Sequence, residues 1–187
     1  MSDLAATVID LLRKRSESIS CAESITGGAI TSKLVSVAGA SDVLLGSIVA
    51  YSKEIKMSQL GLSAELIDSK GLVSQEVAIE MAKGARQRLG SNWAISSTGS
   101  AGPTALDGST PGEIWIAILG PDRQESVKLS LNGARQEVIN GAVESAGRLF
   151  PAQNQLLAGQ SHRNWSRLLE PQMFYWAQLL LIQKRSR

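Results

Sequence analysis

Ser24 is a candidate nucleophile, in the segment 22–28, which reads Ala-Glu-Ser-Ile-Thr-Gly-Gly. The two glycines allow backbone N–H groups to approach a ligand, and the helical pattern that follows would add the positive end of a helix dipole. Such a turn suits either a nucleophile or a bound anion. The alternative is that Ser24 caps the helix while the glycines form a tight turn, and the spacing gives both interpretations equal weight.

A serine hydroxyl needs a base to remove its proton, and the composition restricts which residue can serve. His162 is the only histidine and Cys21 the only cysteine, so neither a His-dependent triad nor a His/Cys metal site is expected. The base must then be a lysine or a carboxylate. Lys53 and Lys56 follow an apolar strand pattern, although spacing alone favours a solvated helix face for both.

A third block, Thr98-Gly99-Ser100-Ala101-Gly102-Pro103, is another glycine loop at the end of a strand pattern. Its backbone could approach a phosphate or a carbonyl group. A turn that needs unusual dihedral angles explains the same residues equally well. Arg135, near the start of a later helix pattern, is by default an exposed charge.

Alternating helix and strand patterns must position these blocks. The order is helix, strand, helix, strand, three helices, three strands and a helix, which predicts a three-layer α/β/α sandwich with a mixed β-sheet. The strands are expected at 18–22, at 43–51 as a buried strand, and at 93–97, 113–119 and 125–131. The helices are expected at 1–12, around 30–35, from 52, from 63, at 74–90 and at 134–150.

Composition narrows the class of protein. A chain of 187 residues with a net charge of +2 fits one domain and lacks the basic stripe of a nucleic-acid binder. The apolar run 173–182 is too short to span a membrane, and the N-terminal pattern is not that of a signal peptide. We therefore expect a cytoplasmic protein without nucleic-acid or membrane partners.

The domain is expected to cover residues 1–150, followed by a C-terminal appendage over residues 151–187. The appendage carries the aromatic patch 173–176 and a basic end, and we expect it to be helical. Packing on the core or on a neighbouring subunit of a homo-oligomer is favoured over a functional role.

In order along the chain, these blocks resemble the CinA C-terminal family, from about the first helix to Phe150. The similarity is carried by the segment 22–28, by Tyr51-Ser52 with Lys56, and by three further segments. These are Val-Ser-Gln-Glu-Val at 73–77, the loop 98–103, and Gly112 with Trp115.

The resemblance implies an amidase that converts nicotinamide mononucleotide to nicotinic acid mononucleotide and ammonia, without metal or cofactor. It implies Ser24 as nucleophile, Lys56 as general base and Tyr51 as an orienting or substrate contact. Backbone N–H groups near Thr26 to Gly28 would stabilise the oxyanion, and Arg135 would meet the phosphate. The remaining residues implied to line the nucleotide site are Glu23, Thr26, Gly27, Gly28, Thr98, Gly99, Ala101 and Gly102.

Several positions depart from the family pattern near the implied substrate site. They are Lys53, Ser100, the segment 109–111, Ala134 and Ile139. These departures motivate an alternative, a catalytically silent relative that binds a nucleotide or a partner in competence or DNA-damage responses. A third possibility is an assembly protein that uses the aromatic C-terminal segment.

Overall fold

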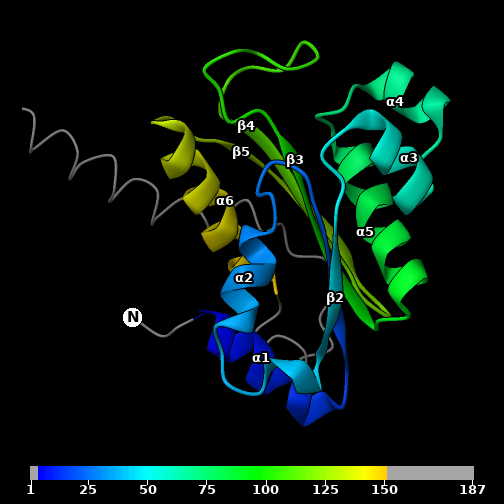
Figure 1. The fold of residues 1–187 in the computed structure, drawn as a ribbon, viewed down its shortest axis with the longest axis vertical. Helices are drawn as coiled ribbons and strands as arrows, with labels where there is room; N and C mark the ends of the chain where they lie inside the picture. Colours follow the sequence, from blue (N-terminus) through cyan, green and yellow to red (C-terminus); the bar gives the residue numbers. More distant parts are fainter. Residues whose placement is uncertain (1–3, 151–187) are drawn as a thin grey trace, which may run out of the picture. The chain divides into compact units, whose positions relative to one another are not determined.

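The computed structural model describes residues 4–150, so the expected appendage at 151–187 lies outside the described residues. Eleven regular elements and one short 3₁₀ turn, Ala40–Asp42, follow one another in this range (Figure 1). The strands are β1 (Ile19–Glu23), β2 (Leu44–Val49), β3 (Trp93–Gly99), β4 (Glu113–Leu119) and β5 (Gln124–Ser130). The helices are α1 (Leu4–Arg15), α2 (Ala29–Val35), α3 (Lys53–Leu60), α4 (Ala64–Lys70), α5 (Gln75–Leu89) and α6 (Arg135–Leu149).

The five strands form one mixed sheet in the order β2-β1-β3-β4-β5. β1 runs parallel to both β2 and β3, whereas β4 is antiparallel to β3 and to β5. Because the first three strands share a direction, their carboxyl ends meet at one edge of the sheet. The segments that follow these three ends contain the three blocks singled out in the sequence.

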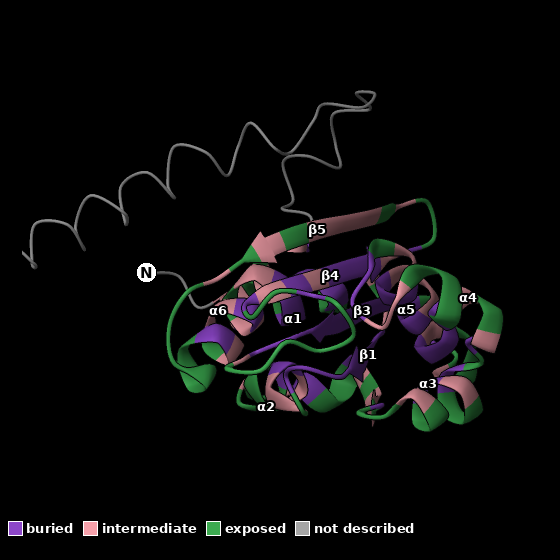
Figure 2. Cartoon of the chain, turned by 90° about the horizontal axis from the view of Figure 1, so that it is seen from above, coloured by how far each residue is buried: buried purple, intermediate pink, exposed green. Residues whose placement is uncertain are grey.

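Helices cover both faces of the sheet, as Figure 1 shows. α1, α2 and α6 enclose one apolar core with Ile19, Ile95 and Ile116, while α3, α4 and α5 enclose the other with Ala22 and Ala94. Figure 2 shows the buried central strands between these layers, with the more exposed β5 at one side. The predicted three-layer α/β/α sandwich is therefore confirmed.

Serine caps fix the starts of three helices. The side chains of Ser52, Ser63 and Ser74 accept the backbone N–H three residues further on, at the beginnings of α3, α4 and α5. Gly61, the residue that follows α3, has a left-handed conformation, which suits a residue without a Cβ atom. These caps explain why the helix starts predicted around 52, 63 and 74 agree with the structure.

The strand expected to be buried at 43–51 is instead an edge strand, so that prediction is wrong. β2 pairs on one side only, and Leu45 and Val49 are 50% and 47% exposed. An uncharged apolar run is typical of a central strand, but here it lies at the border of the sheet. β3 also runs two residues further than predicted, because Thr98 and Gly99 pair with Trp115 and Ile114 of β4.

Candidate functional site

Ser24 and Lys56 meet in the structure, although 32 positions separate them in the sequence. The Lys56 Nζ atom lies 2.8 Å from Ser24 Oγ and donates a second hydrogen bond of 2.9 Å to the Ala50 carbonyl. The Tyr51 carbonyl lies at 3.5 Å from the same nitrogen. Ser24 is 7% exposed and Lys56 2% exposed, so the pair is almost completely shielded from water.

Burial sets the protonation of the lysine. It lowers the pKa of Lys56 from 10.5 to about 8, because the charged ammonium loses its hydration. A substantial fraction of the amine is then neutral near physiological pH, as a general base requires. The expectation of a solvated Lys56 is thus wrong.

Lys53, one turn earlier in α3, lies in the opposite environment. Its ammonium pairs with the Asp68 carboxylate at the surface, and this contact raises the pKa of Lys53. Lys53 therefore stays charged and makes a surface ion pair rather than a contact with Ser24.

Glu23, the residue before Ser24, is fully buried at the end of β1. One carboxylate oxygen accepts from Thr26 Oγ1 at 2.7 Å, from the Gly28 N–H at 2.9 Å and from the Ile30 N–H at 3.0 Å. The other accepts from the N–H of Thr31 at 2.8 Å and from its hydroxyl. Both oxygens of the carboxylate therefore accept hydrogen bonds from residues 26–31 of the same segment.

The backbone N–H groups of the turn 24–28 are largely committed to internal bonds. The Gly27 N–H donates to the Ser24 carbonyl at 3.2 Å, and Gly28 donates to Glu23. Neither glycine N–H is thus available to an oxyanion, contrary to expectation. Among the described residues, the N–H groups of Ile25 and Thr26 have no recorded acceptor, and they stand beside the nucleophile.

Arg135 connects two of the loops at this edge of the sheet. Its guanidinium donates a hydrogen bond of 3.0 Å to the Tyr51 hydroxyl and another of 3.1 Å to the Gly102 carbonyl. Tyr51 is 63% exposed, so this bridge lies at the surface. Three residues that the sequence implicated are thereby brought together.

The other residues of the loop 98–103 make mainly internal contacts. The buried Thr98 hydroxyl donates 2.7 Å to the Leu72 carbonyl, and Ala101 is 6% exposed. A Cβ atom at Gly99 would lie 2.7 Å from the Glu113 carbonyl oxygen, so only glycine fits there. Ser100 donates to the Thr104 carbonyl at 3.2 Å.

Two contributors to the site were not anticipated from the sequence. The Ala50 carbonyl accepts a hydrogen bond from Lys56, and a main-chain acceptor cannot be predicted from a pattern of side chains. Ser97 accepts the Ser24 N–H through its carbonyl at 2.9 Å, and its hydroxyl lies 2.6 Å from that of Thr26. The available signal was the run of hydroxyl residues at 96–98, which ends an otherwise apolar strand.

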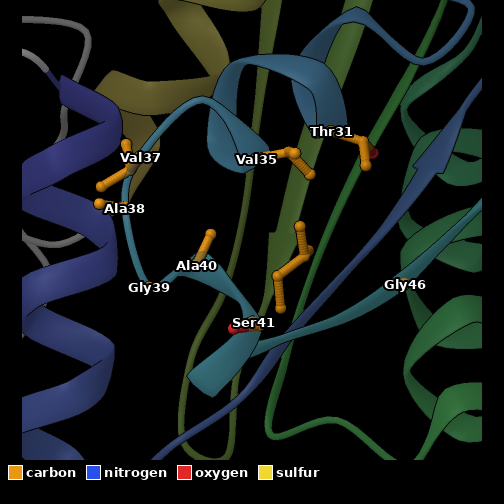
Figure 3. A pocket seen from close by; sticks show the side chains of 9 residues that line it. Thr31, Val35, Val37, Ala38, Gly39, Ala40, Ser41 and Gly46 are labelled. Atoms are coloured by element: carbon orange, nitrogen blue, oxygen red, sulfur yellow. The ribbon is translucent and has the colours of Figure 1, made fainter.

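A pocket of about 520 Å³ lies elsewhere, between α2, the loop after it and β2 (Figure 3). Small and apolar residues line it, with Thr31 and Ser41 supplying hydroxyls. It contains neither member of the Ser24–Lys56 pair and no titratable side chain. We therefore assign the chemistry to the carboxyl edge of the sheet and not to this pocket.

Within residues 4–150, no three His, Cys, Asp or Glu side chains are grouped as metal ligands would be. No helix in this part of the chain is long and apolar enough to cross a membrane.

An α/β/α sandwich with a buried serine–lysine pair beyond its parallel strands defines the structural class. Comparison with known proteins then places the chain within it. The family model of the CinA C-terminal domain matches residues 1–152, so the chain belongs to this family.

Curated relatives carry the same family name. A CinA-like protein from Prochlorococcus marinus is 47% identical over 119 residues, covering 63% of this chain and 28% of the relative. A CinA-like protein from Kosmotoga olearia is 42% identical over 143 residues, covering 74% of this chain and 34% of the relative. The chain thus matches about a third of the length of these relatives.

Solved structures share the fold. The competence damage-inducible protein A from Klebsiella pneumoniae superposes with a TM-score of 0.78 at 28% identity, covering 84% of this chain and 98% of that one. The competence/damage inducible protein from Agrobacterium tumefaciens gives 0.75 at 30% identity, with coverages of 79% and 91%.

Proposed function

We propose that this chain is an amidohydrolase that converts nicotinamide mononucleotide to nicotinic acid mononucleotide and ammonia. The observation that carries the proposal is the buried Lys56 amine 2.8 Å from the Ser24 hydroxyl. The pair supports the reaction type, and the resemblance in the motif residues supplies the substrate.

The contacts of Lys56 suit a neutral amine that acts as a base. Once it is neutral, the amine keeps two hydrogens, which it can donate to the Ala50 and Tyr51 carbonyls, and its lone pair can accept the Ser24 hydroxyl proton across the 2.8 Å contact. As Ser24 Oγ attacks the carboxamide carbon, its proton passes to Lys56 Nζ and the carbonyl oxygen becomes an oxyanion. The N–H groups of Ile25 and Thr26 are the candidate oxyanion donors. Loss of one such donor typically costs about 100- to 1,000-fold in rate.

The oxyanion then collapses and the C–N bond breaks. Lys56 returns its proton to the departing nitrogen, which leaves as ammonia, and the acyl group remains as an ester on Ser24. A water molecule attacks this ester while Lys56 takes its proton. Passage of that proton to Ser24 Oγ releases the acid and restores both side chains.

Arg135 is the candidate contact for the substrate phosphate. Its guanidinium already spans Tyr51 and Gly102 at the surface, and a phosphate offers the same planar group stronger acceptors. Tyr51 would then be released to contact the substrate. We place this small-molecule reaction in the cytoplasm, where pyridine nucleotides are recycled.

The experiment is an assay of ammonia and nicotinic acid mononucleotide release from nicotinamide mononucleotide, with a chelator present. Ser24→Ala is expected to lose at least about 1,000-fold in kcat/KM and Lys56→Met at least about 100-fold. Lys53→Met is the matched control, because it makes the same change one turn earlier in α3 and should keep activity within about twofold. A folded parent that binds the nucleotide without turnover would favour the silent, ligand-binding relative instead.

A further inference from the structure

The Glu23 carboxylate is a buried, fully hydrogen-bonded charged group next to the nucleophile. It is fully buried and accepts five hydrogen bonds. The donors are the hydroxyls of Thr26 and Thr31 and the N–H groups of Gly28, Ile30 and Thr31. No ion pair involving this residue is recorded within residues 4–150. Backbone N–H groups and the positive end of α2 therefore balance the charge, rather than a lysine or arginine.

These contacts span the whole nucleophile turn. Glu23 ends β1, Ser24 follows directly, and the donors lie between three and eight residues further on. The Ala29 N–H is taken by the Thr26 carbonyl at 3.0 Å, so the protein itself satisfies the starting N–H groups of α2. An external anion therefore finds these donors already occupied.

A second set of contacts ties the same turn to β3. The Ser24 N–H donates to the Ser97 carbonyl, and the Thr26 hydroxyl lies between the Glu23 carboxylate and the Ser97 hydroxyl. Ser24 is thus fixed by its main chain on one side and by the Glu23 network on the other. Its Oγ atom is held at the lysine without a direct contact from Glu23.

We propose that Glu23 is a positioning residue for Ser24, rather than the substrate contact that the sequence implied. Its carboxylate locks the turn 24–28 onto the start of α2 and so maintains the 2.8 Å approach of Ser24 Oγ to Lys56 Nζ. A displacement of about 1 Å in such a pair costs about 100-fold in rate. The inference deepens the proposed function, but it depends only on Ser24 being the nucleophile.

The test uses a small alkyl fluorophosphonate on the full chain, which does not require the substrate to be known. Ser24 Oγ attacks phosphorus, a P–O bond forms, the P–F bond breaks, fluoride leaves and Lys56 takes the serine proton. The rate of label appearing on the Ser24 peptide is measured by mass spectrometry, with Ser24→Ala as the unlabelled reference.

Glu23→Gln keeps the shape but replaces one acceptor oxygen with a donor, and it is expected to slow labelling about 10- to 100-fold. With nicotinamide mononucleotide, kcat should fall by a similar factor while KM stays within about twofold. Thr31→Val removes one donor from the carboxylate and is the second variant if Glu23→Gln does not fold. It should slow labelling at least about threefold.

Ser63→Ala is the matched control, because it removes the cap of α4 at a helix remote from Ser24. It should lower the midpoint of thermal unfolding and leave the labelling rate within about twofold. Labelling of Glu23→Gln or Thr31→Val at the parent rate would overturn the proposal. So would a raised KM with unchanged kcat, or a parent whose Ser24 is not labelled. A labelled parent that fails to hydrolyse nicotinamide mononucleotide would refute the substrate and leave Glu23 in its role.

Discussion

At the scale of single residues, the site depends on the different environments of two lysines in the same helix. Lys53 and Lys56 are three positions apart, and the sequence offered both as bases. One reaches Asp68 at the surface, and the other lies beneath the turn that carries Ser24. The difference arises from the direction of each side chain around α3, which places Lys56 toward β1 and shields it from water.

The buried amine predicts a pH dependence with a definite sign. The neutral amine is the reactive form, and its fraction falls about tenfold for each pH unit below the pKa of about 8. We expect kcat/KM for ammonia release to rise with pH toward 8 and to level off above it. The Lys53→Met variant should follow the same profile. A kcat/KM that stays constant between pH 6 and 8 would contradict Lys56 as the base.

At the scale of elements, much of the fold was predictable because local signals agreed with the tertiary structure. Serine caps and terminal glycines mark α3 and α5, and β4 was predicted with its observed bounds. The edge position of β2 was not predictable, because an uncharged strand pattern does not reveal how many neighbours the strand has.

The role of the nucleophile turn was also only partly predictable. Strand-to-helix spacing located Ser24. It could not show that the N–H groups of Gly27 and Gly28 donate hydrogen bonds to Ser24 and Glu23 of the same segment. Glu23 lies six residues before the start of α2, and the only available signal for its role was that carboxylates favour helix N-termini. Hydrogen-bond acceptors on the main chain, such as the Ala50 carbonyl, leave no trace in residue types.

The bridge between loops leads to a prediction about substrate recognition. Arg135 comes from the start of α6 and joins the segments that follow β2 and β3. Arg135→Ala should raise KM for nicotinamide mononucleotide about 10- to 100-fold, because a charge-assisted contact to phosphate is lost. It should change KM for nicotinamide riboside, which lacks the phosphate, less than about threefold. Equal increases for both substrates would instead assign Arg135 to the loop structure alone.

At the scale of the whole molecule, the topology creates the site. The chain leaves β1 into α2 on one face of the sheet and leaves β2 into α3 on the other. Such a divergence between neighbouring parallel strands opens a crevice at their carboxyl ends, where ligands bind in open α/β sheets. Ser24 and Lys56 enter from the two sides of this divergence, so neither element alone could supply the pair.

The extent of the family match predicts which residues are sufficient for folding and activity. The match covers residues 1–152, and every residue assigned to the site lies between Glu23 and Arg135. A chain that ends at residue 152 should therefore fold and keep kcat/KM within about threefold of the full chain. Thermal unfolding and ammonia release would be measured side by side, with sedimentation velocity to compare oligomeric states. Loss of activity in a folded, truncated chain would assign a role to the residues beyond 152.

The most direct test of the central claim is a search for the ester on Ser24 during turnover. The parent would be mixed with nicotinamide mononucleotide, quenched in acid within one turnover and digested for peptide mass mapping. We predict that the peptide containing Ser24 gains the mass of the substrate less ammonia, and that Ser24→Ala gains nothing and releases no ammonia. Ammonia release by Ser24→Ala at the parent rate, with no adduct in either protein, would contradict the serine–lysine mechanism.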